Sequence, residues 1–278
     1  MKQFKRVLSI AGTDPSAGAG IQADLKTASA LKVYCTTVIT GVVNQNTQGV
    51  RDILPLSADW LEAQIRAVLD DVGTDAIKIG MLCNREQISV VARLIKEYGV
   101  RDVVLDPVLA STSGAEFLKK ADYQFLLSEL VPLVRLVTPN LPEAALLLGE
   151  ELTEETPIAY LGGQLTKRTS TSVLIKGGHD EYTKGLGIVM DYLFDMEGKK
   201  PIEVFYGDYY QTRNTHGTGC TLSTAIASWL ALKPHRTLAY NVGKAHEYVA
   251  NAIKFAQGLE IGKGHGPLNH FWKFYNRK

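Results

Sequence analysis

Strand and helix patterns alternate along most of this chain, and this alternation constrains its fold more than any other feature. Short apolar or β-branched runs, each typical of a buried strand, lie at residues 7–10, 36–40, 76–79, 103–105, 136–137 and 173–176. Stretches with helical spacing lie between them, at residues 21–31, 63–72, 87–98 and 142–148. This order favours an α/β fold with a mainly parallel sheet covered on both faces by helices. No linker, repeat or low-complexity stretch interrupts it, so we expect a single domain over residues 1–278.

The composition argues against several classes of protein. The formal net charge is +1 at pH 7, which gives no reason to expect nucleic acid or an anionic membrane surface as the main partner. The three widely spaced cysteines form neither a disulfide framework nor a zinc pattern, and they fit a reducing cytoplasm. There is no signal-peptide pattern and no apolar run long enough to span a bilayer. We therefore expect a cytoplasmic protein that acts on small molecules.

A glycine-containing stretch in the C-terminal third of the chain gives the strongest local evidence for a catalytic site. It reads Asn-Thr-His-Gly-Thr-Gly-Cys over residues 214–220, and an apolar helical pattern follows at 221–230. Glycines let a backbone approach a ligand closely, and the free N–H groups at the start of a helix attract phosphate. Cys220 would lie in the first turn, where a helix dipole lowers the pKa of a thiol. The same residues also fit a plain turn before a core helix, with Cys220 as a small buried side chain.

Polar residues follow several of the predicted strands. Asp106, Asn140, Glu143 and Lys176 each come just after a strand end, and in open α/β sheets ligands bind outside the carboxyl ends of the strands. Two carboxylates, an amide and a lysine suit a site for magnesium and a nucleotide. Each residue also has a local interpretation, since an Asp-Pro pair makes turns and Asn140 with Glu143 would form a capping box.

Two further segments suggest a small-molecule pocket. The stretch 11–24 is rich in small residues but matches neither the dinucleotide-binding nor the phosphate-loop glycine pattern. Asp24, on the first turn of the next helix, either faces the pocket or complements the helix dipole. The stretch 42–48 is rich in amides, which pair well with an aminopyrimidine and are also ordinary loop residues.

Taken in order and spacing, eight segments of this chain resemble the hydroxymethylpyrimidine/phosphomethylpyrimidine kinases of thiamine biosynthesis. The segments are AGTDPSAGAGIQADLKT (11–27), QNTQGV (45–50), KIGM (78–81), DPVLASTSG (106–114), TPNLPEA (138–144), KGGH (176–179), NTHGTGCTLS (214–223) and GKGHGPLNH (262–270). The resemblance implies a ribokinase-like three-layer α/β/α sandwich with a mainly parallel central sheet. It also implies ATP-dependent phosphorylation of 4-amino-5-hydroxymethyl-2-methylpyrimidine to its monophosphate and then to its diphosphate.

Two alternatives are weighed against this function. Pyridoxine/pyridoxal kinases, which act on vitamin B6, have the same Gly-Thr-Gly-Cys turn, and the amide-rich segment 45–48 favours the aminopyrimidine over them. A ligand sensor without catalysis would not need the intact set of Asn140, Glu143, Lys176 and Cys220.

The resemblance also assigns roles to individual residues. Phosphoryl transfer falls to Cys220, to the anion hole of Gly217, Thr218 and Gly219, and to Lys176. Pyrimidine binding falls to Asp24, Gln45, Met81 and Val108. Nucleotide binding falls to Asn140, Glu143 and Lys176, and binding of Mg²⁺ to Asp106 and Glu143. The implied cofactors are ATP and Mg²⁺, and the implied assembly is a homodimer.

Cys220 departs from the wider ribokinase-like pattern, in which an aspartate serves as the catalytic base. A thiol needs activation before it can accept a proton from a primary alcohol, and the helix N-terminus would supply part of it. The second reaction needs little base, because a monophosphate acceptor is already ionised near neutral pH.

Overall fold

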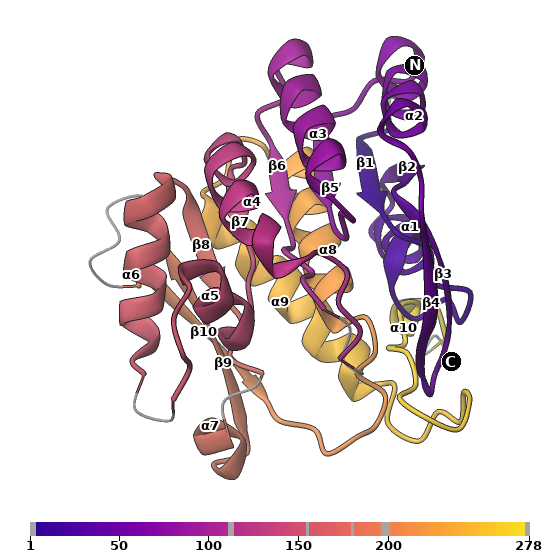
Figure 1. The fold of residues 1–278 in the computed structure, drawn as a ribbon. Helices are drawn as coiled ribbons and strands as arrows, with labels where there is room; N and C mark the ends of the chain where they lie inside the picture. The colour runs from indigo at the N-terminus through magenta and orange to yellow at the C-terminus, as the bar shows by residue number, and fades with distance from the viewer. Residues whose placement is uncertain (1–3, 111–113, 154–155, 179–180, 196–200, 276–278) are drawn as a thin grey trace.

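The central feature of the computed structural model is one large, mainly parallel β-sheet (Figure 1). The structure describes residues 4–110, 114–153, 156–178, 181–195 and 201–275. Within these ranges the sheet has eight strands in the order β10-β9-β8-β7-β6-β5-β1-β2. The strands are β1 (Arg6–Ala11), β2 (Tyr34–Ile39), β5 (Ala76–Ile79), β6 (Val103–Leu105), β7 (Leu136–Val137), β8 (Ser172–Ile175), β9 (Ile188–Phe194) and β10 (Glu203–Asp208). All neighbours from β2 to β8 pair in parallel, and β9 and β10 are antiparallel additions at one edge.

Helices cover both faces of this sheet, which confirms the predicted α/β fold class (Figure 1). One face carries α2 (Ala58–Asp71), α3 (Arg85–Tyr98), α4 (Tyr123–Glu129), α5 (Leu141–Leu148) and α6 (Ile158–Thr169). The other face carries α1 (Gly20–Ala30), α8 (Thr218–Leu232) and α9 (Leu238–Lys254). The short elements are α7 (Glu181–Gly185), α10 (Trp272–Tyr275) and the 3₁₀ turns Lys120–Asp122 and Val131–Leu133.

The alternation of side chains along each strand explains the two layers of core. Val7 and Ala76 belong to the core beneath α1, α8 and α9, whereas their neighbours Leu8 and Ile77 belong to the opposite core. Successive side chains of a strand point to opposite faces, so an uninterrupted apolar strand supplies both layers. Apolar burial of about 25 cal/mol per Å² then holds both helical layers on the sheet.

A β-hairpin outside the main sheet replaces the loop expected at residues 42–48. Strands β3 (Gly41–Asn46) and β4 (Gly49–Pro55) pair with each other in a separate two-stranded sheet. Val43 is buried while Val42 and Asn44 are exposed, which is the alternation of a strand with one wet face. The amides therefore lie on a strand that projects beyond the sheet edge.

The strand order places the functional residues. The chain runs from β1 to β2 on one side, then crosses to β5, β6, β7 and β8 on the other. Such a reversal opens a crevice at the carboxyl ends of the two central strands. Helix α8 packs on β1, β5 and β6, and Gly219 in its first turn lies beside Asp106, which follows β6. None of the helices in the described ranges is long and apolar enough to cross a membrane.

Candidate active site

The glycine turn, residues 214–220, ends in the first turn of α8. Gly217 is the N-cap and has φ +82°, a left-handed conformation that favours glycine. A Cβ atom added to Gly217 would overlap the carbonyl oxygen of Gly18, so the glycine turn packs directly against the backbone of the loop after β1. The first amides of an α-helix have no intrahelical acceptor. The structure thus brings Gly217, Thr218 and Gly219 together at a helix N-terminus that suits an anion.

A cluster of charged side chains lies at the carboxyl ends of β6, β7 and β8. Lys176 Nζ lies 2.7 Å from Asp106 Oδ1 and 3.8 Å from Glu143 Oε2. Thr138 Oγ1 donates a hydrogen bond of 3.2 Å to the same Asp106 oxygen. Residues far apart in the sequence therefore meet, as expected for groups that follow neighbouring parallel strands.

Asn140 and Glu143 form the capping box of α5. Asn140 Oδ1 accepts from Glu143 N at 2.8 Å, and Glu143 Oε2 accepts from Asn140 N at 2.8 Å. Both residues thus have the structural role that their spacing allows. Glu143 nevertheless keeps its carboxylate beside Lys176, so the capping role and a place at the site coexist.

Burial and ion pairing together set the charge states of this cluster. Burial raises the pKa of Glu143 to about 7, against the opposing effect of Lys176. Burial also disfavours the Lys176 cation, but the Asp106 and Glu143 carboxylates outweigh it and raise the pKa of Lys176. No group of three or more His, Cys, Asp or Glu side chains in the described part of the chain could hold a metal by itself. Mg²⁺ commonly uses one or two carboxylates and completes its shell with phosphate and water, so Asp106 and Glu143 fit it as a partial site.

Gly219 joins the helix N-terminus to the charged cluster. A Cβ atom at this position would lie 3.2 Å from both Asp106 Oδ2 and Lys176 Nζ. Ser223, one turn further along α8, has its Oγ 3.5 Å from Asp106 Oδ2. The start of α8 and the Asp106–Lys176 pair are therefore immediate neighbours. A negatively charged group at the start of α8 would meet both.

Cys220 lies in the first turn of α8, as predicted, but the expected lowering of its pKa is wrong. Burial raises the pKa of the Cys220 thiol to about 11, and the opposing effect of the nearby Lys78 cation is smaller. The sequence could suggest the helix dipole but not the desolvation, which depends on packing. The thiol of the unliganded protein is therefore protonated at neutral pH.

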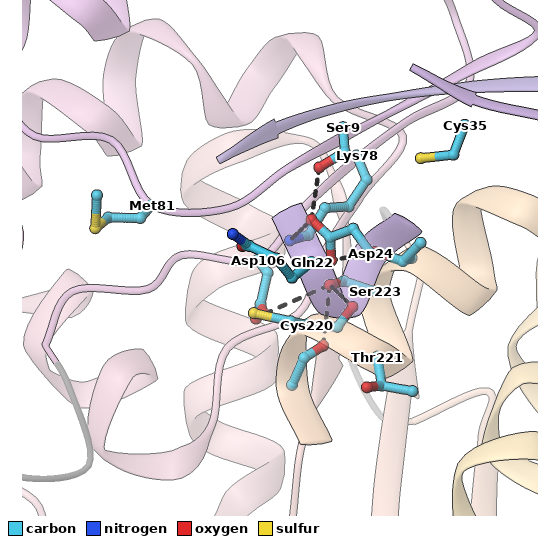
Figure 2. A network of polar contacts seen from close by, with 12 residues as sticks. Ser9, Gln22, Asp24, Cys35, Lys78, Met81, Asp106, Cys220, Thr221 and Ser223 are labelled. Atoms are coloured by element: carbon cyan, nitrogen blue, oxygen red, sulfur yellow. Dashed lines mark hydrogen bonds and ion pairs between the residues drawn. The ribbon is translucent and has the colours of Figure 1, made fainter. Parts of the chain in front are cut away.

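Asp24 lies in a buried network of polar side chains near the start of α8. It is completely buried, and Lys78 Nζ lies 2.8 Å from its Oδ2. Ser9 Oγ donates to Oδ2 and Thr224 Oγ1 donates to Oδ1, each at 2.6 Å. Figure 2 shows this network beside the first turn of α8, where Cys220 lies. Both carboxylate oxygens are occupied by protein donors, so the structure makes Asp24 the counterion of Lys78, and a direct contact with a pyrimidine stays a prediction.

Lys78 supplies the positive charge of this network and is not among the predicted site residues. It is fully buried within β5, whose other residues Ala76, Ile77 and Ile79 are apolar. A fully buried lysine is rare unless it is paired. The charged residue inside an otherwise apolar strand was the available signal, but its partner could not be identified from the sequence.

Gln45, Met81 and Val108 lie on three segments that reach the same end of the sheet. Gln45 is half-buried on β3, and its Nε2 donates to the carbonyl oxygen of Thr13 at 3.4 Å. Met81 is buried after β5, close to Gly12 and Gly41. Val108, half-buried, lies two residues after Asp106 and donates its N–H to the Asp106 carbonyl at 2.8 Å.

His216 links the glycine turn to the loop after β1. Its Nε2 lies 2.8 Å from Oδ2 of the buried Asp14. Burial opposes ionisation of Asp14, but hydrogen bonds from His216, Ser16 and Ala19 lower its pKa to about 2. The carboxylate therefore stays charged and orders both loops.

Comparison with known proteins gives consistent matches over nearly the whole chain. A family model described as phosphomethylpyrimidine kinase matches residues 14–269. The hydroxymethylpyrimidine/phosphomethylpyrimidine kinase of Salmonella typhimurium is 45% identical over 95% of this chain and 96% of its own length. Among solved structures, a Bacillus subtilis pyridoxal kinase in an ADP complex has a TM-score of 0.82 and 31% identity, covering 99% of this chain and 100% of its own. A phosphomethylpyrimidine kinase from Clostridium difficile has a TM-score of 0.73 and 36% identity, covering 90% of this chain and 99% of its own.

Proposed function

The chain belongs to the phosphomethylpyrimidine kinase family, and on this premise we propose that it phosphorylates 4-amino-5-hydroxymethyl-2-methylpyrimidine in two ATP-dependent steps. The first step gives the monophosphate and the second the diphosphate, for thiamine biosynthesis. The fold is ribokinase-like and the chemistry is that of a phosphotransferase. We treat residues 1–278 as one catalytic domain.

The observation that carries this proposal is the meeting of Gly219 with Asp106 and Lys176 at the start of α8. Phosphoryl transfer requires little covalent chemistry from a protein and depends on positioning and charge neutralisation. The amides of the anion hole, at Gly217, Thr218 and Gly219, would bind the transferred phosphoryl group, and Lys176 would neutralise the charge on its oxygens. Asn140, at the N-cap of α5 beside Glu143, would contact the nucleotide.

Mg²⁺ would be held by Asp106 and Glu143, and when bound it neutralises the phosphate oxygens of ATP. Burial raises the pKa of Glu143 to about 7, and a divalent cation beside it would favour the ionised carboxylate. ATP itself is supported by the ADP complex of the related B. subtilis kinase.

Cys220 would act as the base in the first step, accepting the proton of the hydroxymethyl group while that oxygen attacks the γ-phosphorus in line with the leaving oxygen. Its protonated state in the unliganded protein means that substrate binding must favour the thiolate, and the buried Lys78 cation works in that direction. The second step uses a phosphate oxygen that is already ionised, so it depends less on Cys220.

Gln45, Met81 and Val108 would form the pyrimidine side of the pocket. The strong identity to named pyrimidine kinases favours this substrate over vitamin B6, although a pyridoxal kinase shares the fold. Asp24 would support the site through Lys78. We also propose a homodimer in the cytoplasm, in line with the family resemblance and the composition.

Product analysis tests the proposal. The protein is incubated with Mg-ATP and hydroxymethylpyrimidine, and the products are followed over time by mass spectrometry. The monophosphate should appear first and then decline as the diphosphate accumulates. Accumulation of ADP without a phosphorylated pyrimidine, or no consumption of ATP, would contradict the proposed function.

A further inference from the structure

The segment GKGHG, residues 262–266, is part of the last family-like segment and contains none of the proposed site residues. We call it the C-terminal loop. It follows α9 and lies beside the turn of the β3–β4 hairpin (Figure 1). It also contacts the start of the glycine turn, so it touches both sides of the proposed pocket.

On the hairpin side, the C-terminal loop binds both acceptors of one residue. The N–H of His265 donates to the carbonyl oxygen of Thr47 at 2.8 Å. The N–H of Gly264 donates to Thr47 Oγ1 at 3.2 Å. Thr47 is two residues from Gln45, the residue proposed to read the pyrimidine.

On the catalytic side, the loop pairs with the residues that lead into α8. The N–H of Gly266 donates to the carbonyl oxygen of Arg213 at 3.1 Å, and the N–H of His216 donates to that of Gly266 at 3.0 Å. Asn214 Nδ2 anchors the chain before the loop by donating to the carbonyl oxygens of Ala256 at 2.7 Å and Leu259 at 2.9 Å.

The glycines of the C-terminal loop are required by this close approach. A Cβ atom at Gly264 would overlap the carbonyl oxygen of Thr47, and one at Gly262 would overlap the Thr47 side chain. A Cβ atom at Gly266 would overlap Asn214 Oδ1. At Gly264 the clash is with backbone, so any other residue would require the hairpin turn or the loop to move. At Gly262 and Gly266 the Thr47 and Asn214 side chains would have to shift.

The hairpin depends on such contacts because it is not part of the main sheet. At its base, Thr13 N donates to Gly41 O at 3.1 Å and Leu56 N to Thr40 O at 2.9 Å. Its turn is held by the C-terminal loop. A shift of the turn would move Gln45. The proposed nucleotide residues lie elsewhere, since Asn140 and Glu143 are at the start of α5 and Lys176 follows β8.

We propose that Thr47 and the C-terminal loop are positioning elements that fix Gln45 relative to Cys220, and so hold the hydroxymethyl group in line with the phosphoryl group. This inference rests on the proposed function. It assigns to residues outside the pocket a part in aligning the reacting atoms, where a small misplacement is costly to rate.

The test compares Gly264→Ala, Thr47→Val and Thr47→Ser with the unmodified protein. Gly264→Ala should raise the KM for hydroxymethylpyrimidine about tenfold or more and lower kcat, with the KM for ATP within about twofold. Thr47→Val, which keeps the shape and loses the Oγ1 acceptor, should raise the pyrimidine KM about fivefold, the loss expected for one hydrogen bond. Thr47→Ser keeps the hydroxyl acceptor and should leave the pyrimidine KM close to that of the unmodified protein. Lys263→Ala, an exposed side chain on the same loop, is the matched control and should leave the constants unchanged.

Circular dichroism establishes that each variant is folded. If Gly264→Ala does not fold, the pyrimidine KM values of Thr47→Val and Thr47→Ser test the inference in its place. Equal increases in KM for ATP and for the pyrimidine, or unchanged constants in folded Gly264→Ala, would overturn the inference.

If the unmodified protein phosphorylates no pyrimidine, the proposed function fails instead. Hydrogen exchange then tests the loop alone, since Gly264→Ala should speed exchange in both the hairpin and residues 214–220, and unchanged exchange would overturn the inference.

Discussion

Lys78 and Asp24 form a buried ion pair whose removal has a calculable cost. Both side chains have 0% exposure, and Nζ lies 2.8 Å from Oδ2. Replacing Lys78 with Met removes the cation and leaves the Asp24 carboxylate buried with two hydroxyl donors, Ser9 and Thr224. Breaking one side of a buried pair costs about 3–5 kcal/mol of unfolding free energy. At about 2–4 °C per kcal/mol for a chain of roughly this size, the melting temperature should fall by roughly 6–20 °C.

The assay is urea unfolding at pH 7, with the free energy extrapolated to zero denaturant. Asp24→Asn should cost a similar amount because it leaves Lys78 without its counterion. The double variant Lys78→Met/Asp24→Asn should be more stable than the sum of the two losses by at least about 2 kcal/mol, since neither charge is then stranded.

A surface pair at the same distance provides the control. Lys244 Nζ lies 2.8 Å from Glu247 Oε2, but the side chains are 40% and 63% exposed. Lys244→Met should change the unfolding free energy by less than about 1 kcal/mol. Two results would contradict this prediction. One is a double variant whose loss of unfolding free energy equals the sum of the Lys78→Met and Asp24→Asn losses. The other is a single-variant loss as small as that of Lys244→Met.

Three further predictions concern the site. Cys220→Ala should lower kcat for hydroxymethylpyrimidine by about 10²–10³-fold and for its monophosphate by less than about tenfold; equal losses in the two steady-state assays would exclude Cys220 as the first-step base. Gln45→Ala should raise the pyrimidine KM about tenfold and leave the KM for ATP within about twofold, so parallel increases in both constants would count against a pyrimidine contact. Because the pKa of Cys220 is raised to about 11, its reactive thiolate is scarce at neutral pH. Its alkylation by iodoacetamide in the unliganded protein should therefore quicken about tenfold per pH unit between pH 7 and 9, and a plateau in that range, measured by peptide mass spectrometry, would disprove the raised pKa.

The parallel part of the fold was predictable because each strand carries its own signal. The runs at 76–79 and 103–105 match β5 and β6 in both limits, since apolar strands buried on both faces end at a glycine or an aspartate. The stretch 42–48 resembles a loop because three consecutive amides, at residues 44–46, interrupt the apolar pattern of β3 and hide the strand. The antiparallel edge strands β9 and β10 were also missed.

The candidate site was predictable where it depends on sequence order. Asp106 and Lys176 follow strands that are neighbours of one shared strand in the sheet, so their meeting could be expected. The pairing of Lys78 with Asp24, 54 positions apart, and the raised pKa of Cys220 could not. Both depend on which groups lose water on folding, and that follows from packing rather than from local pattern.

The most direct test of the central claim is a comparison of kcat/KM for hydroxymethylpyrimidine, its monophosphate and pyridoxal under the same Mg-ATP conditions. The account predicts turnover of both pyrimidines, with kcat/KM for hydroxymethylpyrimidine at least about tenfold above that for pyridoxal. An equal or higher value for pyridoxal would leave the fold and the phosphoryl-transfer site in place, but it would contradict the assignment of this protein as a pyrimidine kinase.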